Sequence, residues 1–328
     1  MALNNNPTKT RSIENAFRRE NKKRFAIFSG RIKKAIDSSQ ILTTNFNTRM
    51  QRIKNANGFD MSEQEYTAFI KFLRNQAYRD IIGVFDPMNA NSAVTPDNTD
   101  LWQEKYIAGA YARNLDMAAK DHRRAGQSGE LTTDDLKGLY GVVSDTQAAQ
   151  IMLASNPLHG ATVASLQQSS LTLLVQNIET MLGQLATEID AARSNTDTGT
   201  TKLKKQLSKR VKVADLTGQQ IARTQTIQAA QEAQINSAGV LTERLGQPVK
   251  VRWITRNDAK VRHLHAQWHG EVMTPEEAKK NITISPWNCR CGFQQVSTGA
   301  DTVKRQKIFD KERAVLVDKE KKQKLGSL

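Results

Sequence analysis

The side chains best suited to localised chemistry lie in one C-terminal segment, residues 253–291. Three of the five histidines and both cysteines of this 328-residue chain fall within these 39 residues. Cys289 and Cys291 are separated by a single residue, so a disulfide between them would be strained. A disulfide framework is therefore excluded, and a reducing compartment is expected.

One chemistry that these residue types allow is metal-dependent hydrolysis. In this interpretation His263, His265, His269, Asp258 and Glu271 would form a nuclease or hydrolase centre, since histidine-rich nucleases also pair a strand with a metal-bearing helix. Against it, the sequence has no second carboxylate cluster at a recognisable spacing, no glycine-rich phosphate loop and no Ser/His/Asp pattern. The enzyme interpretation remains an alternative, and a catalytic site is not predicted.

Short strands and helices are expected to position this segment. Residues 249–255 alternate apolar and polar side chains with the two-residue period of a strand. A short helix capped by Asn257 or Asp258 should run to Trp268 and end at Gly270, and a further helical turn should start at Pro275. Residues 282–285 and 292–296 are strand candidates on either side of the turn that holds the cysteines. Together these predict a small α+β unit, followed by a basic helix over residues 301–324.

The rest of the chain is predominantly helical in its periodicity. Ser62 and Glu65 have the spacing of a capping box, and alanines in one helix form a small-residue face that allows close backbone packing, with Gly239 as the expected C-cap. Residues 194–201 are polar and indicate a loop or a domain boundary. The predicted helices cover residues 12–37, 62–82, 100–120, 132–140, 163–192 and 217–239.

These patterns predict a mainly α protein with a small C-terminal α+β module. The expected parts are an elongated helical N-terminal region, 1–201, with a basic arm, 1–54; the α+β module, 202–298; and a basic helical tail, 299–328. The aromatic fraction is only 6% and the hydrophobic fraction 38%, which is lean for a fully globular chain. No apolar run is long enough to span a membrane and no secretory signal is visible, so we expect a protein of the cytoplasm or of a particle assembled there.

The net charge of +15 is concentrated at the two ends of the chain. Residues 1–54 carry thirteen lysines and arginines against three acids, and residues 301–328 carry nine against five. Within the nearly neutral middle, residues 202–212 carry six basic residues and no acid. Such a distribution favours sequence-independent contact with a polyanion such as double-stranded DNA, although solvated helix faces would give the same composition. The candidate contact residues are Arg18, Arg19, Lys22, Lys23, Arg24, Arg31, Lys33, Lys34, Lys204, Lys205, Lys209 and Arg210.

An ordered set of short motifs between residues 214 and 296 resembles one protein family. Ile-Ala-Arg-Thr ends at Thr224, Trp253 follows, then Asp-Ala-Lys-Val-Arg-His-Leu-His ends at His265, and Cys-Arg-Cys ends at Cys291. In this order the residues resemble the Mu F family of phage head-morphogenesis proteins, also called minor head proteins. The motif residues that we expect to hold the module together are Arg223, Thr224, Trp253, Asp258, Arg262, His265, Gly270, Cys289, Arg290 and Cys291.

The resemblance implies a non-enzymatic virion component. Such a protein would be synthesised in the host cytoplasm, bind the portal protein and packaged DNA inside the head at the portal vertex, and assist assembly, packaging or ejection of the genome. The major capsid protein or a scaffold protein is a further candidate partner. A host nucleic-acid-binding protein is the remaining alternative, and it would bind DNA with sequence preference.

The resemblance also raises the question of zinc. Some relatives carry Cys-x-x-Cys where this chain has Arg262 and His265, and such a pair with Cys289 and Cys291 would make a tetrahedral zinc site. Since Arg262 cannot bind a metal, the fourth ligand here would be His269 or His263, of which His269 lies four residues from His265 and can share its helix face. The alternative is that His265 hydrogen-bonds the backbone of the turn, the cysteines pack as apolar groups, and Arg262 pairs with Asp258. No other cofactor is expected.

Overall fold

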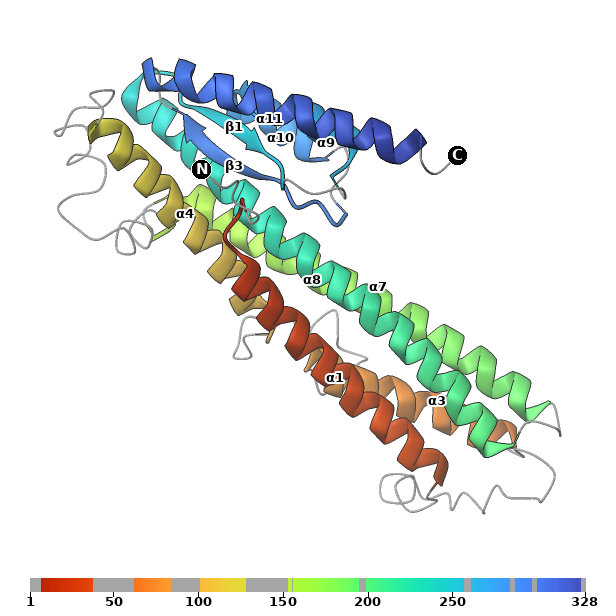
Figure 1. Cartoon of the computed structure of the whole chain (residues 1–328). Helices are drawn as coiled ribbons and strands as arrows, with labels where there is room; N and C mark the ends of the chain where they lie inside the picture. The colour runs from red at the N-terminus through yellow and green to blue at the C-terminus, as the bar shows by residue number, and fades with distance from the viewer. Residues whose placement is uncertain are drawn as a thin grey trace. The chain divides into compact units, whose positions relative to one another are not determined.

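The computed structural model describes residues 7–37, 62–83, 101–127, 153–154, 156–194, 199–256, 261–283, 287–296 and 300–325 (Figure 1). The chain forms two compact units. The helical unit comprises residues 16–105 and 168–222, and the C-terminal unit comprises residues 1–15, 106–167 and 223–328. The division after residue 222 falls within helix α8 (Thr200–Leu245), whereas the expected boundary was at residue 201.

The helical unit is built from long helices that bury one apolar stripe each. In α1 (Arg11–Asp37) the buried residues include Phe17, Phe25, Phe28 and Ile32, at the spacing of one helix face. Helix α1 contacts α3 (Glu63–Ala77) through Arg31 and Gln76, and α3 pairs with α7 (Pro157–Arg193) through Arg74 and Glu179. Asn21 contacts Asp215 and Lys204 pairs with Asp37, so α1 and α8 lie antiparallel.

The capping box predicted at Ser62 is present. The Ser62 hydroxyl accepts a hydrogen bond from the Glu65 backbone N–H, and the Glu65 carboxylate accepts one from the Ser62 N–H. Helix α3 then widens into a π-helical turn, η1 (Tyr78–Ile82), and ends at Gly83, whose φ of +96° is left-handed. The predicted helix over residues 62–82 is therefore confirmed, because its caps at both ends follow from local residue types.

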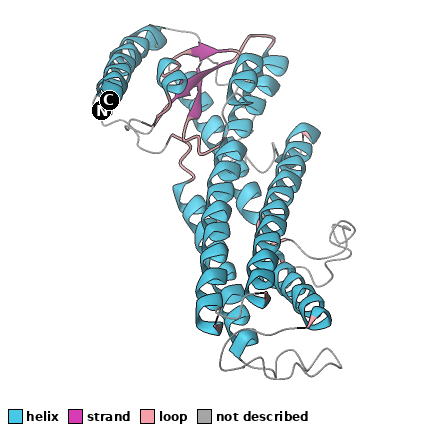
Figure 2. Ribbon diagram, turned by 90° about the vertical axis from the view of Figure 1, so that its right-hand side faces the viewer, coloured by secondary structure: helices cyan, strands magenta, loops and turns pink. Residues whose placement is uncertain are grey.

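The C-terminal unit contains a small antiparallel sheet, drawn in magenta in Figure 2. Among the described residues its strands are β1 (Lys250–Ile254), β2 (Val272–Met273) and β3 (Gly292–Val296), in the order β2-β1-β3, with Trp253 paired to Phe293. Its helices are most of α4 (Glu104–Gln127), the start of α7, the second half of α8, α9 (His263–Gln267), α10 (Pro275–Thr283) and α11 (Ala300–Leu325).

The two faces of this sheet have different partners. Val251 and Trp253 face α8, where they join a core that includes Ile235, Ala238 and Leu241. The intervening Arg252 lies on the other face, with its guanidinium 4.7 Å from the ring centre of Phe309 on α11. The alternation of residues 249–255 thus reflects a sheet covered by a helix on each side, and the predicted fold class, mainly α with a small α+β module, is confirmed (Figure 1).

Several boundaries differ from the sequence-based expectation. Residues 202–212 and the predicted helix over 217–239 belong to one helix, α8, and Gly239 lies inside it, so a C-cap there is wrong. Residues 282 and 283 end α10 and do not form a strand, whereas the two-residue strand β2 was not predicted. The expected start of the short helix at residues 257–258 and the expected helix over 132–140 lie outside the described residues.

No helix in the described part of the chain is long and apolar enough to cross a membrane.

Two glycine substitutions should change the stability in opposite directions. Gly270 has φ +81°, and an added Cβ would lie 2.4 Å from Cβ of Phe309, so Gly270→Ala should destabilise the fold by about 2–4 kcal/mol. Gly239 lies within α8 with no atom within 4 Å of an added Cβ, so Gly239→Ala should stabilise it by about 0.5–1 kcal/mol. Urea unfolding measures both changes; destabilisation by Gly239→Ala would contradict a continuous α8.

Candidate functional site

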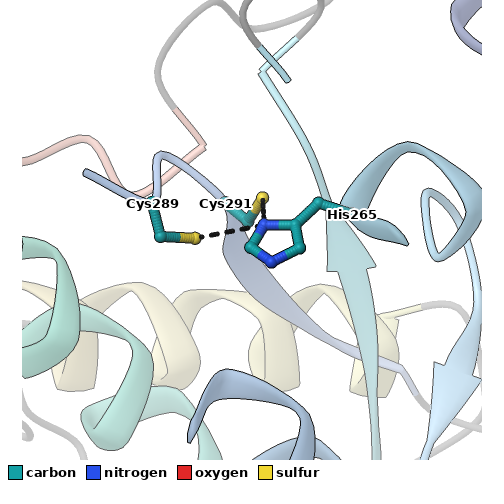
Figure 3. Close-up of side chains that lie close together, drawn as sticks. All are labelled: His265, Cys289 and Cys291. Atoms are coloured by element: carbon teal, nitrogen blue, oxygen red, sulfur yellow. Dashed lines mark hydrogen bonds between the residues drawn. The ribbon is translucent and has the colours of Figure 1, made fainter. Parts of the chain in front are cut away.

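His265, Cys289 and Cys291 lie together in the C-terminal unit (Figure 3). His265 Nδ1 is 3.5 Å from Sγ of Cys289 and 3.4 Å from Sγ of Cys291. All three side chains are buried, and one nitrogen and two sulfur atoms lie within 4.8 Å of one another. Among the histidine, cysteine and acidic side chains of the described residues, these three have ligand atoms close enough together to hold one metal ion.

Aromatic rings hold the imidazole in place. Trp253 is fully buried and contacts the His265 ring edge-on at 5.3 Å between centroids, and it packs in the same way against Trp268 and Phe293. The Trp268 ring stacks on His265 at 5.6 Å with 22° between the planes. These two ring contacts restrict the rotation of His265, whose Nδ1 lies toward the two sulfur atoms.

The turn that carries the cysteines is fastened to helix α8. The Gln231 side-chain amide donates to the Cys291 carbonyl oxygen at 2.8 Å and approaches Cys289 Sγ at 3.7 Å. The Thr224 hydroxyl accepts a hydrogen bond from the Asn288 backbone N–H at 3.1 Å. Asn288 itself has φ +54°, a conformation that asparagine tolerates better than most residues. Helix α8 therefore sets the position of both sulfur atoms.

The two thiols differ in acidity. A hydrogen bond from the Cys291 thiol, together with His265, lowers the pKa of Cys289 well below its ordinary value, although burial opposes this. Burial raises the pKa of Cys291 well above its ordinary value, and the neighbouring Cys289 adds to the rise. Cys289 is therefore the sulfur that ionises first, and the thiolate is the form that binds metals.

Gln231 was not singled out by sequence reasoning. It lies on α8 within the helix that was expected to pack closely through its alanines, and Ala229, Ala230 and Ala233 are indeed buried. The sequence feature that could have pointed to Gln231 is a glutamine flanked by these small residues. Such a glutamine is buried with them, and a buried amide must find a hydrogen-bonding partner.

The other histidines do not join this cluster. His269 Nδ1 lies 3.0 Å from both the backbone nitrogen and the hydroxyl of Thr255, and its Nε2 lies 3.2 Å from the Glu312 carboxylate. Burial lowers the pKa of His269, and Glu312 opposes that shift. Both ring nitrogens of His269 are thus engaged away from the cluster, although its spacing had suggested a fourth metal ligand.

The residues of the nuclease interpretation are likewise dispersed. The His263 ring contacts Gln267 on its own helix, and the Glu271 carboxylate lies 3.9 Å from Arg313. Asp258 lies outside the described residues. The described members of that set therefore do not converge on a common point, as a hydrolytic centre requires.

The remaining motif residues have structural contacts. Arg223 pairs with Glu14 at 2.7 Å, and Arg262 donates to the carbonyl oxygen of Trp287, beside the cysteine turn. The Gly270 N–H donates to the Trp253 carbonyl oxygen. Arg290, which separates the two cysteines in the sequence, has a half-buried side chain. His265 contacts sulfur atoms where a bond to the turn backbone was expected, and the pair of Arg262 with Asp258 remains a prediction.

The basic residues predicted to contact DNA fall into two groups. One group is engaged within the helical unit: Arg24 lies over the Trp102 ring, Arg31 pairs with Asp80, and Arg210 pairs with Glu188; Lys204 pairs with Asp37 and Arg18 donates to Gln219. The other group is exposed on the outer faces of α1 and α8, and comprises Arg19, Lys22, Lys23, Lys33, Lys34, Lys205 and Lys209.

Comparison with known proteins identifies one matching family. Residues 194–294 match the family described as Phage Mu protein F like protein, which confirms the resemblance for that region. The match spans all of α8, the sheet strands β1 and β2, the cysteine turn and the first residues of β3. No curated protein and no solved structure matches the chain.

Replacing Gln231 by leucine should destabilise the protein by about 1–3 kcal/mol, because the buried Cys291 carbonyl then lacks its side-chain donor. The matched control is Gln220→Leu, at an exposed position of the same helix, which should change the stability by less than about 0.5 kcal/mol. Thermal unfolding of both variants compares the two positions. Equal melting temperatures would mean that the bond from α8 does not hold the turn.

Proposed function

We propose that this protein is a minor head protein of a tailed bacteriophage, located inside the head at the portal vertex, where it binds the portal protein and packaged DNA. The observation that carries the proposal is the family match over residues 194–294. Motif residues within the matched range contact one another in the C-terminal unit: Thr224 bonds the cysteine turn, and His265 contacts both Trp253 and Cys289.

Sequence-independent contact with DNA is supported by the exposed lysines of the helical unit. Lys22, Lys23 and Lys33 project from α1, and Lys205 and Lys209 project from α8, all at exposed positions. The antiparallel packing of the two helices brings the end of α1 beside the start of α8, as the pair of Asp37 and Lys204 indicates. Exposed lysines spaced along paired helices suit the regular phosphates of double-stranded DNA, whose neutralisation releases counterions.

A structural role, without catalysis, is supported by the burial of the histidine–cysteine cluster. His265 and Cys291 are each 3% exposed, so a polymeric substrate such as DNA has no path to them. Together with the dispersion of His263, His269 and Glu271, this favours a packing function for the module. Assistance to assembly, packaging or ejection would then come from binding to partners.

Purification of intact particles from an infected or induced host tests the location. Mass spectrometry of gradient fractions should find the protein with the portal and major capsid proteins, at low copy relative to the capsid protein. Recovery only in the soluble fraction, free of particles, would refute a virion role. The host nucleic-acid-binding alternative predicts that second result together with sequence-selective binding.

Reversing two exposed charges should weaken DNA binding. For Lys22→Glu with Lys23→Glu, we expect the Kd for random double-stranded DNA to rise at least about tenfold at low salt, and the slope of log K against log salt to fall by about 2. Fluorescence anisotropy on unrelated duplexes measures both quantities. Arg24 is left unchanged in this variant because it packs on Trp102.

The control for this variant carries the same change in net charge at exposed lysines of other elements, Lys71→Glu with Lys250→Glu. It should retain most of the affinity. If both double variants lose affinity equally, binding depends on net charge alone and the assignment to α1 is wrong.

A further inference from the structure

We propose that Nδ1 of His265 and the sulfur atoms of Cys289 and Cys291 bind one zinc ion, which fastens helix α9 to the turn before strand β3. Zinc prefers thiolate and imidazole ligands in tetrahedral geometry, with zinc–sulfur bonds of about 2.3 Å and zinc–nitrogen bonds of about 2.0–2.1 Å. Those bond lengths place a nitrogen and a sulfur ligand about 3.6 Å apart. The observed separations are 3.5 and 3.4 Å.

A metal ion accounts for this convergence better than thiol hydrogen bonds do. An imidazole nitrogen has either one lone pair or one hydrogen in the ring plane, so Nδ1 can form one good hydrogen bond. Here both sulfur atoms approach that same nitrogen (Figure 3), at 3.5 and 3.4 Å. An ion positioned between the three atoms would bond to each of them at once.

The surroundings of the two sulfur atoms also suit a bound ion. The Gln231 amide approaches Cys289 Sγ and donates to the Cys291 carbonyl oxygen, so it helps to hold both cysteines in position. Polar groups of this kind orient the direct ligands of metal sites and tune their charge. The ring of Trp253 and the stacked ring of Trp268 enclose the imidazole and limit solvent access.

The ligand set differs from the one that spacing alone suggests. His269 is excluded because Thr255 and Glu312 occupy its ring nitrogens. The described residues thus supply three ligands, which leaves one position of a tetrahedral ion for a solvent molecule. The burial of Cys289, Cys291 and His265 indicates a structural ion, because a substrate cannot reach that position.

Such an ion would join parts of the chain that are 24 and 26 residues apart in sequence. It would thereby shorten the loop that the chain must close when the C-terminal unit folds, as other cross-links do. The inference concerns the stability of the module and does not depend on whether the protein resides in a virion.

Metal analysis of the full-length protein, purified without chelators, tests the inference. We expect about one zinc ion per chain by elemental mass spectrometry. Replacement by Co²⁺ should give the visible absorption of a tetrahedral ion together with sulfur-to-metal charge-transfer bands in the near ultraviolet. Removal of the ion by a chelator should lower the Tm by at least about 5 °C, and added zinc should restore it.

Variants separate this site from adventitious binding. Cys289→Ser with Cys291→Ser should abolish stoichiometric zinc and the charge-transfer bands, whereas His263→Asn, two residues from His265 but outside the cluster, should retain both. The measurements on the unmodified chain remain decisive if the double variant fails to fold. Zinc retained by the cysteine variant, or a folded unmodified protein whose zinc content is nil and whose Tm does not respond to zinc, would overturn the inference.

Discussion

The burial of helix α8 between residues 224 and 238 is the constraint on which the C-terminal unit depends. Nearly every side chain in this stretch is buried, and several of them are amides. A buried amide without a partner is costly, so a group on another element that pairs with one is held in place, and three of these amides make such bonds. Gln231 reaches the cysteine turn, Gln234 the backbone of α4 at Asn114, and Asn236 the hydroxyl of Tyr111. The alanines permit close approach, and the amides determine which groups lie opposite.

A count of basic residues overstates the positive charge that the protein can offer to an external partner. Arg24, Arg31 and Arg210 lie among the residues that make the N-terminal and central segments basic, yet each is engaged by a ring or an acid within the helical unit. Their long side chains cover apolar surface while the charged group meets its partner. Lys22, Lys23, Lys205 and Lys209, by contrast, lie at exposed positions of α1 and α8.

The sequence predicted those parts of the fold that local chemistry determines. Ser62 and Glu65 specify a helix start through backbone bonds three residues apart, and the alternation around Trp253 specifies a strand, so both were found. It could not predict that α8 continues past Gly239, because a glycine is compatible with a helix interior when tertiary packing compensates. Strand β2 has only two residues, too few for any periodic signal, and exists because β1 offers it a partner.

For the site, the sequence identified His265, Cys289 and Cys291 but not their arrangement. His265 and His269 were expected to share a helix face, yet α9 ends at Gln267, and beyond that end the four-residue rule no longer applies. Trp268 and Gly270 turn the chain so that His269 faces Thr255 and α11. The role of Gln231 depends on a contact with residues 58 and 60 positions away, which no local pattern encodes.

The start of the described chain has a consequence for synthesis. Thr8 accepts a hydrogen bond from Asn114 through its carbonyl oxygen, and Pro7 and Thr8 lie so close to Gly292 that a Cβ there would meet them at 3.1 and 3.2 Å. Pro7 and Thr8 are thus in contact with a strand that is synthesised much later, and such contacts between distant positions slow folding. On the ribosome, residues 7 and 8 must wait for β3 to emerge. The C-terminal unit is therefore completed only after β3 has been synthesised.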